Sequence, residues 1–280
     1  MSEEIHVSRS EEDIQATLAA LDPTKRQRLI QQIIAAALGS IPWVGGFAAA
    51  AHTYRQEQGQ LEVNNLTHQW LKEHQEKLKT LFTELASLTA RLNQFGPEIE
   101  ERLGSEEYLA IVRKAFRTWD KSDTNEKRNY IVKLLANAGA QTACDDDVVR
   151  LFLDWLDRYH EAHFKVIREV YQKRHATRYA IWKNIHGRFP REDSAEADLF
   201  RFLIDELSQG RIIRQHRDTT IEGEFVRAPK APKGSQGSTL TSAFEDAKEY
   251  ELTALGRQFV HYVFSELVTP LNSPQPPTSQ

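Results

Sequence analysis

A heptad-spaced row of side chains between residues 71 and 95 constrains the fold of this chain most strongly. Its members are alternately three and four residues apart, which is the spacing of one narrow helical seam. The row consists of Leu71, His74, Leu78, Leu81, Leu85, Leu88, Leu92 and Phe95. Gly96 and Pro97 follow and would end the helix. The sequence therefore predicts a long, coiled-coil-like helix within residues 59–98.

This seam has two interpretations. It packs on neighbouring helices of the same chain, or it mediates self-association into a homo-oligomer. In the second case the leucines at 71, 78, 81, 85, 88 and 92 form the contact, and His74 is a polar residue that fixes the register.

An uncharged run, residues 33–51, precedes the heptad helix and is long enough to reach the threshold for a membrane span. Gly39, Pro42 and Gly46 interrupt the run, which favours two half-helices folded into an apolar hairpin within residues 1–58. Asp22 and Pro23 would begin the first helix.

The hairpin is either buried core or a contact with a membrane or a protein partner. The contact residues would be Ile33, Ile34, Leu38, Ile41, Trp43, Val44 and Phe47. In the second case the protein would lie at, or insert into, the inner membrane.

Residues 99–160 predict a helical bundle segment. Ser105 is expected to cap a helix that runs to Asp120. Asp123 with Glu126 has the spacing of a capping box for a helix over residues 127–138. An apolar stripe over residues 148–170 predicts a further helix.

Metal and cofactor chemistry find little support in the chain. His160 and His163 are three residues apart on one helix face, but no third or fourth metal ligand is evident, so His163 is interpreted as structural. The Asp residues after Cys144 suit a helix start better than a metal site. Residues 39–46 lack the Gly-Lys-Ser/Thr ending of a phosphate loop. We therefore expect no cofactor, no metal and no enzymatic activity.

Charge and cysteine content narrow the class of protein further. The chain carries 36 Lys and Arg against 40 Asp and Glu, a net charge of −4. Its single Cys excludes a disulfide framework and suits a reducing cytosol, so a cytoplasmic location is expected. The polar, Pro-rich residues 269–280 predict a disordered tail.

The pattern of elements changes within residues 161–268. The expected elements are helices over 164–173, 179–186 and 194–209, strands over 211–214 and 250–253, and a final helix over 254–266. In the third helix, Leu199, Phe202, Leu203 and Leu207 are expected to face inward.

Two segments of this region resemble parts of a known family of domains. Leu203-Ile-Asp-Glu-Leu-Ser-Gln-Gly-Arg-Ile-Ile213 and Tyr250-Glu-Leu-Thr-Ala-Leu-Gly-Arg-Gln-Phe259 resemble the end of the recognition helix and the wing return of bacterial winged-helix domains. The resemblance implies an α+β fold and DNA binding, with the third helix in the major groove. The long wing, residues 215–248, departs from the usual short one.

The charges of that third helix argue against DNA. The helix contains a single basic residue, Arg201, against four acidic ones, Glu196, Asp198, Asp205 and Glu206. Carboxylates repel the DNA phosphates, whose contacts supply most of the affinity for DNA. The wing is basic, with a net charge of +3 over residues 211–233. Its candidate nucleic-acid contacts are Arg211, Arg214, Arg217, Arg227, Lys230 and Lys233. We favour a protein partner, with DNA bound through the wing as the alternative.

The segment Gly39-Ser-Ile-Pro-Trp-Val-Gly-Gly46, followed by a charged heptad helix, resembles uncharacterised bacterial helical proteins, some of which are found beside phage-defence genes. That resemblance implies a membrane-linked or self-associating role. The expected fold class is mainly α: a helical hairpin, a long helix and a bundle, with a C-terminal winged-helix domain.

Overall fold

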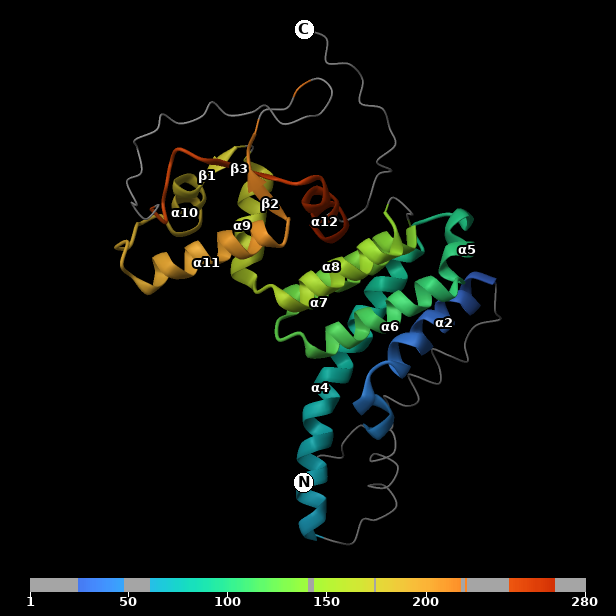
Figure 1. Ribbon diagram of the computed structural model, residues 1–280. Helices are drawn as coiled ribbons and strands as arrows, with labels where there is room; N and C mark the ends of the chain where they lie inside the picture. The colour runs from blue at the N-terminus through green and yellow to red at the C-terminus, as the bar shows by residue number, and fades with distance from the viewer. Residues whose placement is uncertain are drawn as a thin grey trace. The chain divides into compact units, whose positions relative to one another are not determined.

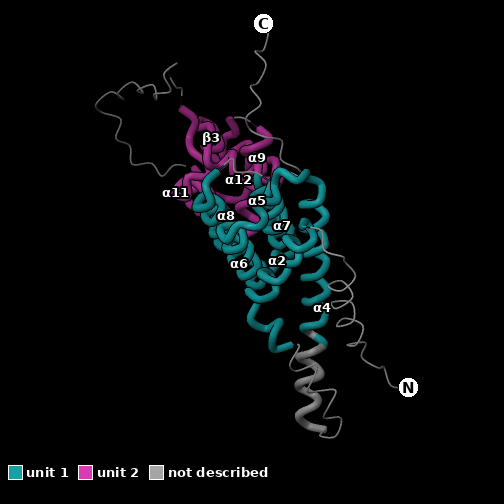
Figure 2. The backbone as a smooth tube through the Cα atoms, turned by 90° about the vertical axis from the view of Figure 1, so that its right-hand side faces the viewer, with its two compact units in different colours: residues 1–158, 262–280 teal, residues 159–261 magenta. Residues whose placement is uncertain are grey.

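The computed structural model describes residues 25–47, 61–140, 144–173, 175–217, 220 and 242–264, with side chains of α4 from residue 74 onward and at 72. Within these residues the protein is mainly helical with a small antiparallel sheet, so the expected helical class is confirmed (Figure 1). The chain forms two compact units: unit 1 comprises residues 1–158 and 262–280, and unit 2 residues 159–261 (Figure 2). The expected helix start at Asp22 and the expected tail at 269–280 lie outside the described residues.

Unit 1 is a helical bundle centred on α7 (Asn125–Ala140). Its other elements are α2 (Lys25–Gly39), α4 (Leu61–Leu92), the 3-10 turn η1 (Pro97–Ile99), α5 (Glu100–Leu103), α6 (Glu106–Lys121) and α8 (Asp146–Arg158). The helices α4, α6 and α8 all pack against α7. Every residue of α7 from Tyr130 to Gly139 is buried, as expected of a helix enclosed on all sides.

Side chains hold the ends of these helices. Ser105 caps α6 as expected, because its side chain accepts a hydrogen bond from the backbone N–H of Tyr108. The predicted capping box of Asp123 and Glu126 is wrong. Thr124 is the capping residue instead, and its Oγ1 accepts from the N–H of Lys127 at 3.3 Å. A capping oxygen one residue later allows α7 to begin at Asn125.

The apolar stripe over residues 148–170 belongs to two helices rather than one. α8 ends at Arg158, and α9 (Glu161–Gln172) begins after His160, whose backbone is extended with φ −90° and ψ 168°. A residue in that conformation cannot continue a helix. The N–H of His160 donates to Nδ1 of His163 at 3.2 Å, which fixes the start of α9.

Unit 2 combines helices with the sheet. After α9 it contains β1 (Ala176–Thr177), α10 (Arg178–His186), α11 (Ala195–Gln209), β2 (Ile213–Gln215), β3 (Glu249–Leu252) and the start of α12 (Ala254–Phe264). The strand order is β1-β3-β2, and both pairs are antiparallel. The strand β1 was not predicted from the sequence, because two residues are too few to show alternation.

Aromatic side chains form much of the core of unit 2. The ring of Trp182 in α10 lies 5.1 Å from that of Phe200 in α11 and 5.1 Å from that of Phe244, measured between centroids. Phe200 and Phe244 stack at 5.9 Å. This cluster joins α10, α11 and the segment that leads into β3, and so decides which face of α11 points inward.

Candidate functional site

The inner face of α11 differs from the expected one. Phe200, Leu203 and Leu207 are buried, whereas Leu199 and Phe202 are 54% and 53% exposed. The expectation that Leu199 and Phe202 face inward is therefore wrong. The three buried residues satisfy the helical period, with spacings of three and four. The sequence held this signal, but Leu199 with Leu203 fits the same period equally well.

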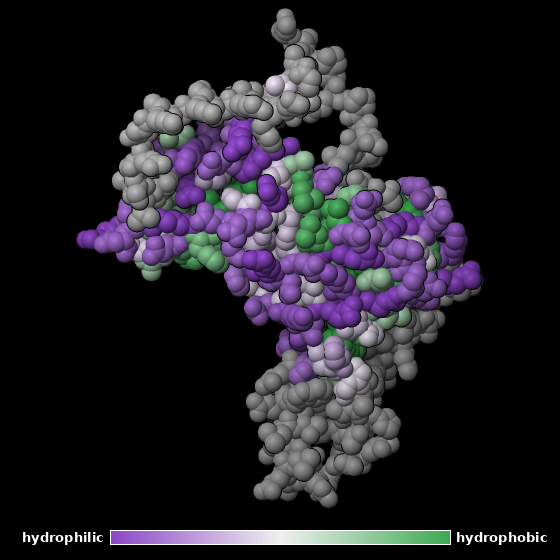
Figure 3. Space-filling model, viewed as in Figure 1, coloured by the Kyte–Doolittle hydropathy of each residue, from purple (hydrophilic) through white to green (hydrophobic). Residues whose placement is uncertain are grey.

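Leu199 and Phe202 form a small apolar surface, which we call the α11 patch. They are one helical turn apart and therefore neighbours on the helix. A hydrophobic area interrupts the hydrophilic surface over α11 (Figure 3). The ring of His163 packs edge-on against that of Phe202, with 6.4 Å between the ring centroids. Neighbouring exposed apolar side chains of this size are typical of contact surfaces.

Four carboxylates surround the α11 patch. Helical spacing places Glu196 beside Leu199 on one edge, and Asp198 and Asp205 beside Phe202 on the other. Glu206 follows Phe202 by one turn. The surface is thus apolar in its centre and acidic at its margins.

These carboxylates have unequal partners. Asp198 pairs with Arg201 at 2.8 Å and Asp205 with Arg178 at 3.3 Å, yet their side chains stay 73% and 59% exposed. Glu196 forms no ion pair with any residue that the structure describes. The carboxylates of both pairs therefore remain open to solvent, where an ion pair contributes little stability.

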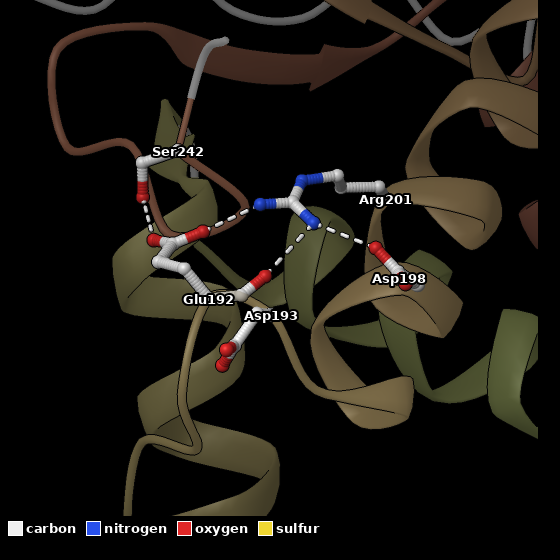
Figure 4. Close-up of a pocket in the computed structure, with 5 residues that line it drawn as sticks. All are labelled: Glu192, Asp193, Asp198, Arg201 and Ser242. Atoms are coloured by element: carbon white, nitrogen blue, oxygen red, sulfur yellow. Dashed lines mark hydrogen bonds and ion pairs between the residues drawn. The ribbon is translucent and has the colours of Figure 1, made fainter.

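A surface hollow beside the start of α11 is held together by Glu192 (Figure 4). Its carboxylate accepts hydrogen bonds from the hydroxyl of Ser242 and from the N–H of Ala243 at 3.0 Å. Arg201 donates to the same carboxylate at 2.6 Å. Asp193 points away from this guanidinium (Figure 4) and pairs with Arg191.

The side chain of Glu192 in the hollow has a structural role. Partial burial acts to raise the pKa of Glu192, but the hydrogen bonds from Ser242 and Ala243 and the charge of Arg201 outweigh it, so its pKa lies below the ordinary value. An ionised carboxylate whose oxygens are already occupied has no free role as a base or ligand. Glu192 therefore ties the segment at 242–243 to the start of α11.

His163 is a buried structural residue. Its Nδ1 accepts from the N–H of His160, and its Nε2 lies 3.0 Å from a carboxylate oxygen of Glu206. Burial lowers the pKa of His163, although Glu206 acts in the opposite direction. Both ring nitrogens are thus engaged by the chain. The described residues contain no group of three or more His, Cys, Asp or Glu arranged to hold a metal ion.

The basic residues expected to contact nucleic acid are only partly placed. Arg214 in β2 donates to Glu251 in β3 at 2.7 Å, so its charge is neutralised across the sheet. Arg211 and Arg217 are exposed. The remaining candidates, Arg227, Lys230 and Lys233, lie outside the described residues. The structure therefore describes three of the six, of which Arg214 is paired across the sheet.

The candidate contact residues of the hairpin lie against the bundle. Ile33, Ile41 and Phe47 are buried, and the others, Ile34, Leu38, Trp43 and Val44, are partly buried. The helix α2 packs on α6, and the indole N–H of Trp43 donates to Asp120 at 2.7 Å. These contacts favour the interpretation of residues 33–47 as core. In the part of the chain that is described, no helix is both long and apolar enough to cross a membrane.

The leucines of the heptad seam face the interior of unit 1. Leu78, Leu81, Leu85, Leu88 and Leu92 are all buried, and α4 packs on α7. The side chain of Leu71 lies outside the described part. His74 contacts the ring of Trp43 edge-on at 5.0 Å. The five buried leucines are therefore not available on the surface of the folded chain.

Exposure, charge and position thus single out α11 as the candidate interaction surface. Comparison of the chain with protein-family models, with curated proteins and with solved structures gave no match.

Proposed function

We propose that this chain is a non-enzymatic interaction protein, in which unit 1 is a helical scaffold and unit 2 is a winged-helix module that binds a protein partner through α11. The observation that carries the proposal is the α11 patch: Leu199 and Phe202 stand exposed among carboxylates. A DNA-reading helix in the major groove needs phosphate-attracting neighbours instead.

The order of elements in unit 2 supports the winged-helix assignment. A helix, a strand, two helices and two strands follow one another from α9 to β3, with the last strand in the middle of the sheet. In this arrangement α11 takes the place of the recognition helix, and the connection from β2 to β3 takes the place of the wing. The charge of α11 supports a protein partner over DNA at that position.

Contacts within unit 1 support its role as a scaffold. The arginine Arg26 donates to the carbonyl oxygens of Leu92, Phe95 and Gly96, and so joins α2 to the end of α4. Arg102 and Asp146 join α5 to α8 at 3.1 Å. In this proposal the apolar hairpin contributes to the core of the bundle, because its residues Ile33 and Ile41 are buried there.

Site-specific photo-crosslinking in the native cells tests the proposal. We place p-benzoylphenylalanine at position 202 in one variant and at position 171 in a control, since Tyr171 is 56% exposed on α9 of the same unit. We expect a defined protein adduct from position 202 and none from position 171. Adducts at both positions, or at neither, would contradict the proposal.

DNA binding through the wing is the competing function, and the exposed Arg211 and Arg217 favour it. A gel shift with random-sequence duplex at low salt separates the two. Unchanged mobility of the duplex agrees with our proposal. A salt-sensitive shift that disappears in the variant R214A/R217A/K230A would replace the proposal with a DNA-binding regulator.

A further inference from the structure

We infer that the occupant of the α11 patch is a basic amphipathic helix of the partner protein. Two apolar residues of that helix would cover Leu199 and Phe202, and Lys or Arg side chains on its flanks would meet the surrounding carboxylates. This inference rests on the proposed function and names the chemistry of the partner.

Charge is the first argument. Four carboxylates lie around the patch, of which Asp198 pairs with Arg201 and Asp205 with Arg178. The carboxylates beside the patch are accessible, with Asp198 and Asp205 more than half exposed. A partner with the opposite charge gains affinity and association rate from such a margin.

Shape is the second argument. Leu199 and Phe202 are one turn apart on α11, whose N-terminus is fixed by the side chain of Ser194, which accepts from the N–H of Ala197. A partner helix presents matching apolar residues at the same three- or four-residue spacing. Its basic residues on opposite flanks then reach Glu196 on one edge of α11 and Asp205 on the other.

The same features argue against other occupants. Nucleic acid and anionic lipid surfaces carry negative charge and are repelled by the margin of the patch. A second copy of this chain would place the same carboxylates against one another across a two-fold axis, because such an interface is self-complementary. A basic protein segment is the occupant that satisfies both the apolar centre and the acidic margin.

Fluorescence anisotropy with the purified full-length chain tests the inference. The probe is a labelled Lys/Leu peptide about 14 residues long, or roughly four helical turns, with leucines on one face. The comparison peptide has Glu in place of every Lys. We compare the variant L199S/F202S with the control Y171S, which also removes an exposed apolar side chain.

A second pair of variants isolates the charge. E196Q/D205N removes one carboxylate from each edge of the patch. The control D147N/D154N changes exposed acids of α8, which pair with Arg150 and Lys114. Circular dichroism and thermal unfolding verify that every variant is folded.

We expect saturable binding of the Lys/Leu peptide and no binding of the Glu/Leu peptide. L199S/F202S is expected to weaken binding at least about tenfold, the size of a typical hot-spot loss. E196Q/D205N is expected to weaken it and to reduce its salt dependence. Both controls should bind as the wild type does.

Three results would overturn the inference: failure of the wild type to bind the Lys/Leu peptide, equal binding of both peptides, or wild-type affinity of L199S/F202S. The two experiments together distinguish failure of this inference from failure of the proposed function. If the peptide assay fails while position 202 still crosslinks to a protein, the module binds a protein of other chemistry. If the peptide binds as expected and no protein adduct forms, the proposed function fails.

Discussion

A methyl group placed on Gly256 would lie 2.1 Å from the carbonyl oxygen of Ile212, so the first turn of α12 touches the backbone that enters β2. Thr253 fastens the same junction. Its Oγ1 accepts from the N–H of Gly256 at 2.9 Å and donates to the carbonyl oxygen of Arg211 at 2.6 Å. The Leu-Thr-x-x-Gly spacing at residues 252–256 thus has a physical reason: Thr caps the helix, and Gly permits the close approach.

The substitution Gly256→Ala is expected to destabilise the protein by about 1–3 kcal/mol, because the added methyl group meets backbone that cannot rotate away. Urea unfolding followed by circular dichroism measures the change. Gly39→Ala is the matched control, since a methyl group there has no atom within 4 Å. Equal midpoints for Gly256→Ala and the wild type would show that α12 and β2 are not in contact.

The face of α11 that points inward can be tested with two phenylalanines. Phe200 is 2% exposed and packs on Trp182 and Phe244, so Phe200→Ala is expected to cost about 3–5 kcal/mol in unfolding free energy. Phe202→Ala is expected to change stability by less than about 0.5 kcal/mol, as exposed positions do. Thermal and urea unfolding of both variants give the comparison. A greater loss in Phe202→Ala would reverse the assigned face.

Strong local signals made much of the fold predictable. The leucine spacing over residues 71–92 predicted a long helix, and the structure has α4 from Leu61 to Leu92. Ser105 and Ser194 are side-chain caps followed by amphipathic segments, and both begin helices where expected. Such features depend on neighbours in sequence, so sequence alone reveals them.

Predictions of the inner helix face and of the helix break were wrong where two local structures fit the sequence pattern equally well. Tertiary contacts select one of them. Leu199 and Leu203 fit the helical period as well as Phe200 and Leu203 do. Only the ring cluster of Trp182 and Phe244 selects Phe200 for the interior. The break at His160 was missed for the same reason, because the apolar period continues across it while the backbone does not. The α11 patch could not be predicted until that choice was made.

Glu192→Gln is expected to loosen the segment at residues 242–243 without unfolding unit 2. The amide keeps the size of the side chain but removes the charge that holds Arg201 and accepts from Ser242 and Ala243. Amide hydrogen exchange at Ala243 should become faster in the variant. The substitution Asp193→Asn is the control, since Asp193 pairs only with the exposed Arg191 among the described residues. Unchanged protection at Ala243 in Glu192→Gln would contradict the role of Glu192.

The same carboxylate gives a pH dependence with a defined sign. The pKa of Glu192 in the folded chain lies below its ordinary value of 4.5, so the unfolded chain takes up a proton first as the pH falls. The contribution of Glu192 is therefore present above about pH 4.5 and is lost as the pH falls through the folded-state pKa. Protection of Ala243 should decrease over that range in the wild type and stay level in Glu192→Gln.

His163 is expected to destabilise the protein in mild acid. Burial holds its pKa below the ordinary 6.5, so between 6.5 and the lowered value the unfolded chain binds a proton that the folded chain does not. Stability should therefore fall as the pH drops below about 6.5. His186 and His261 also have lowered pKa values and contribute in the same direction, so the wild-type profile alone does not isolate His163.

A difference between variants separates the contribution of His163. His163→Gln retains a polar side chain that can donate to Glu206, and removes the titrating ring. The difference in unfolding free energy between the wild type and His163→Gln should favour the wild type least at low pH and most near neutral pH. A level difference across this pH range would contradict the lowered pKa of His163 in the folded chain.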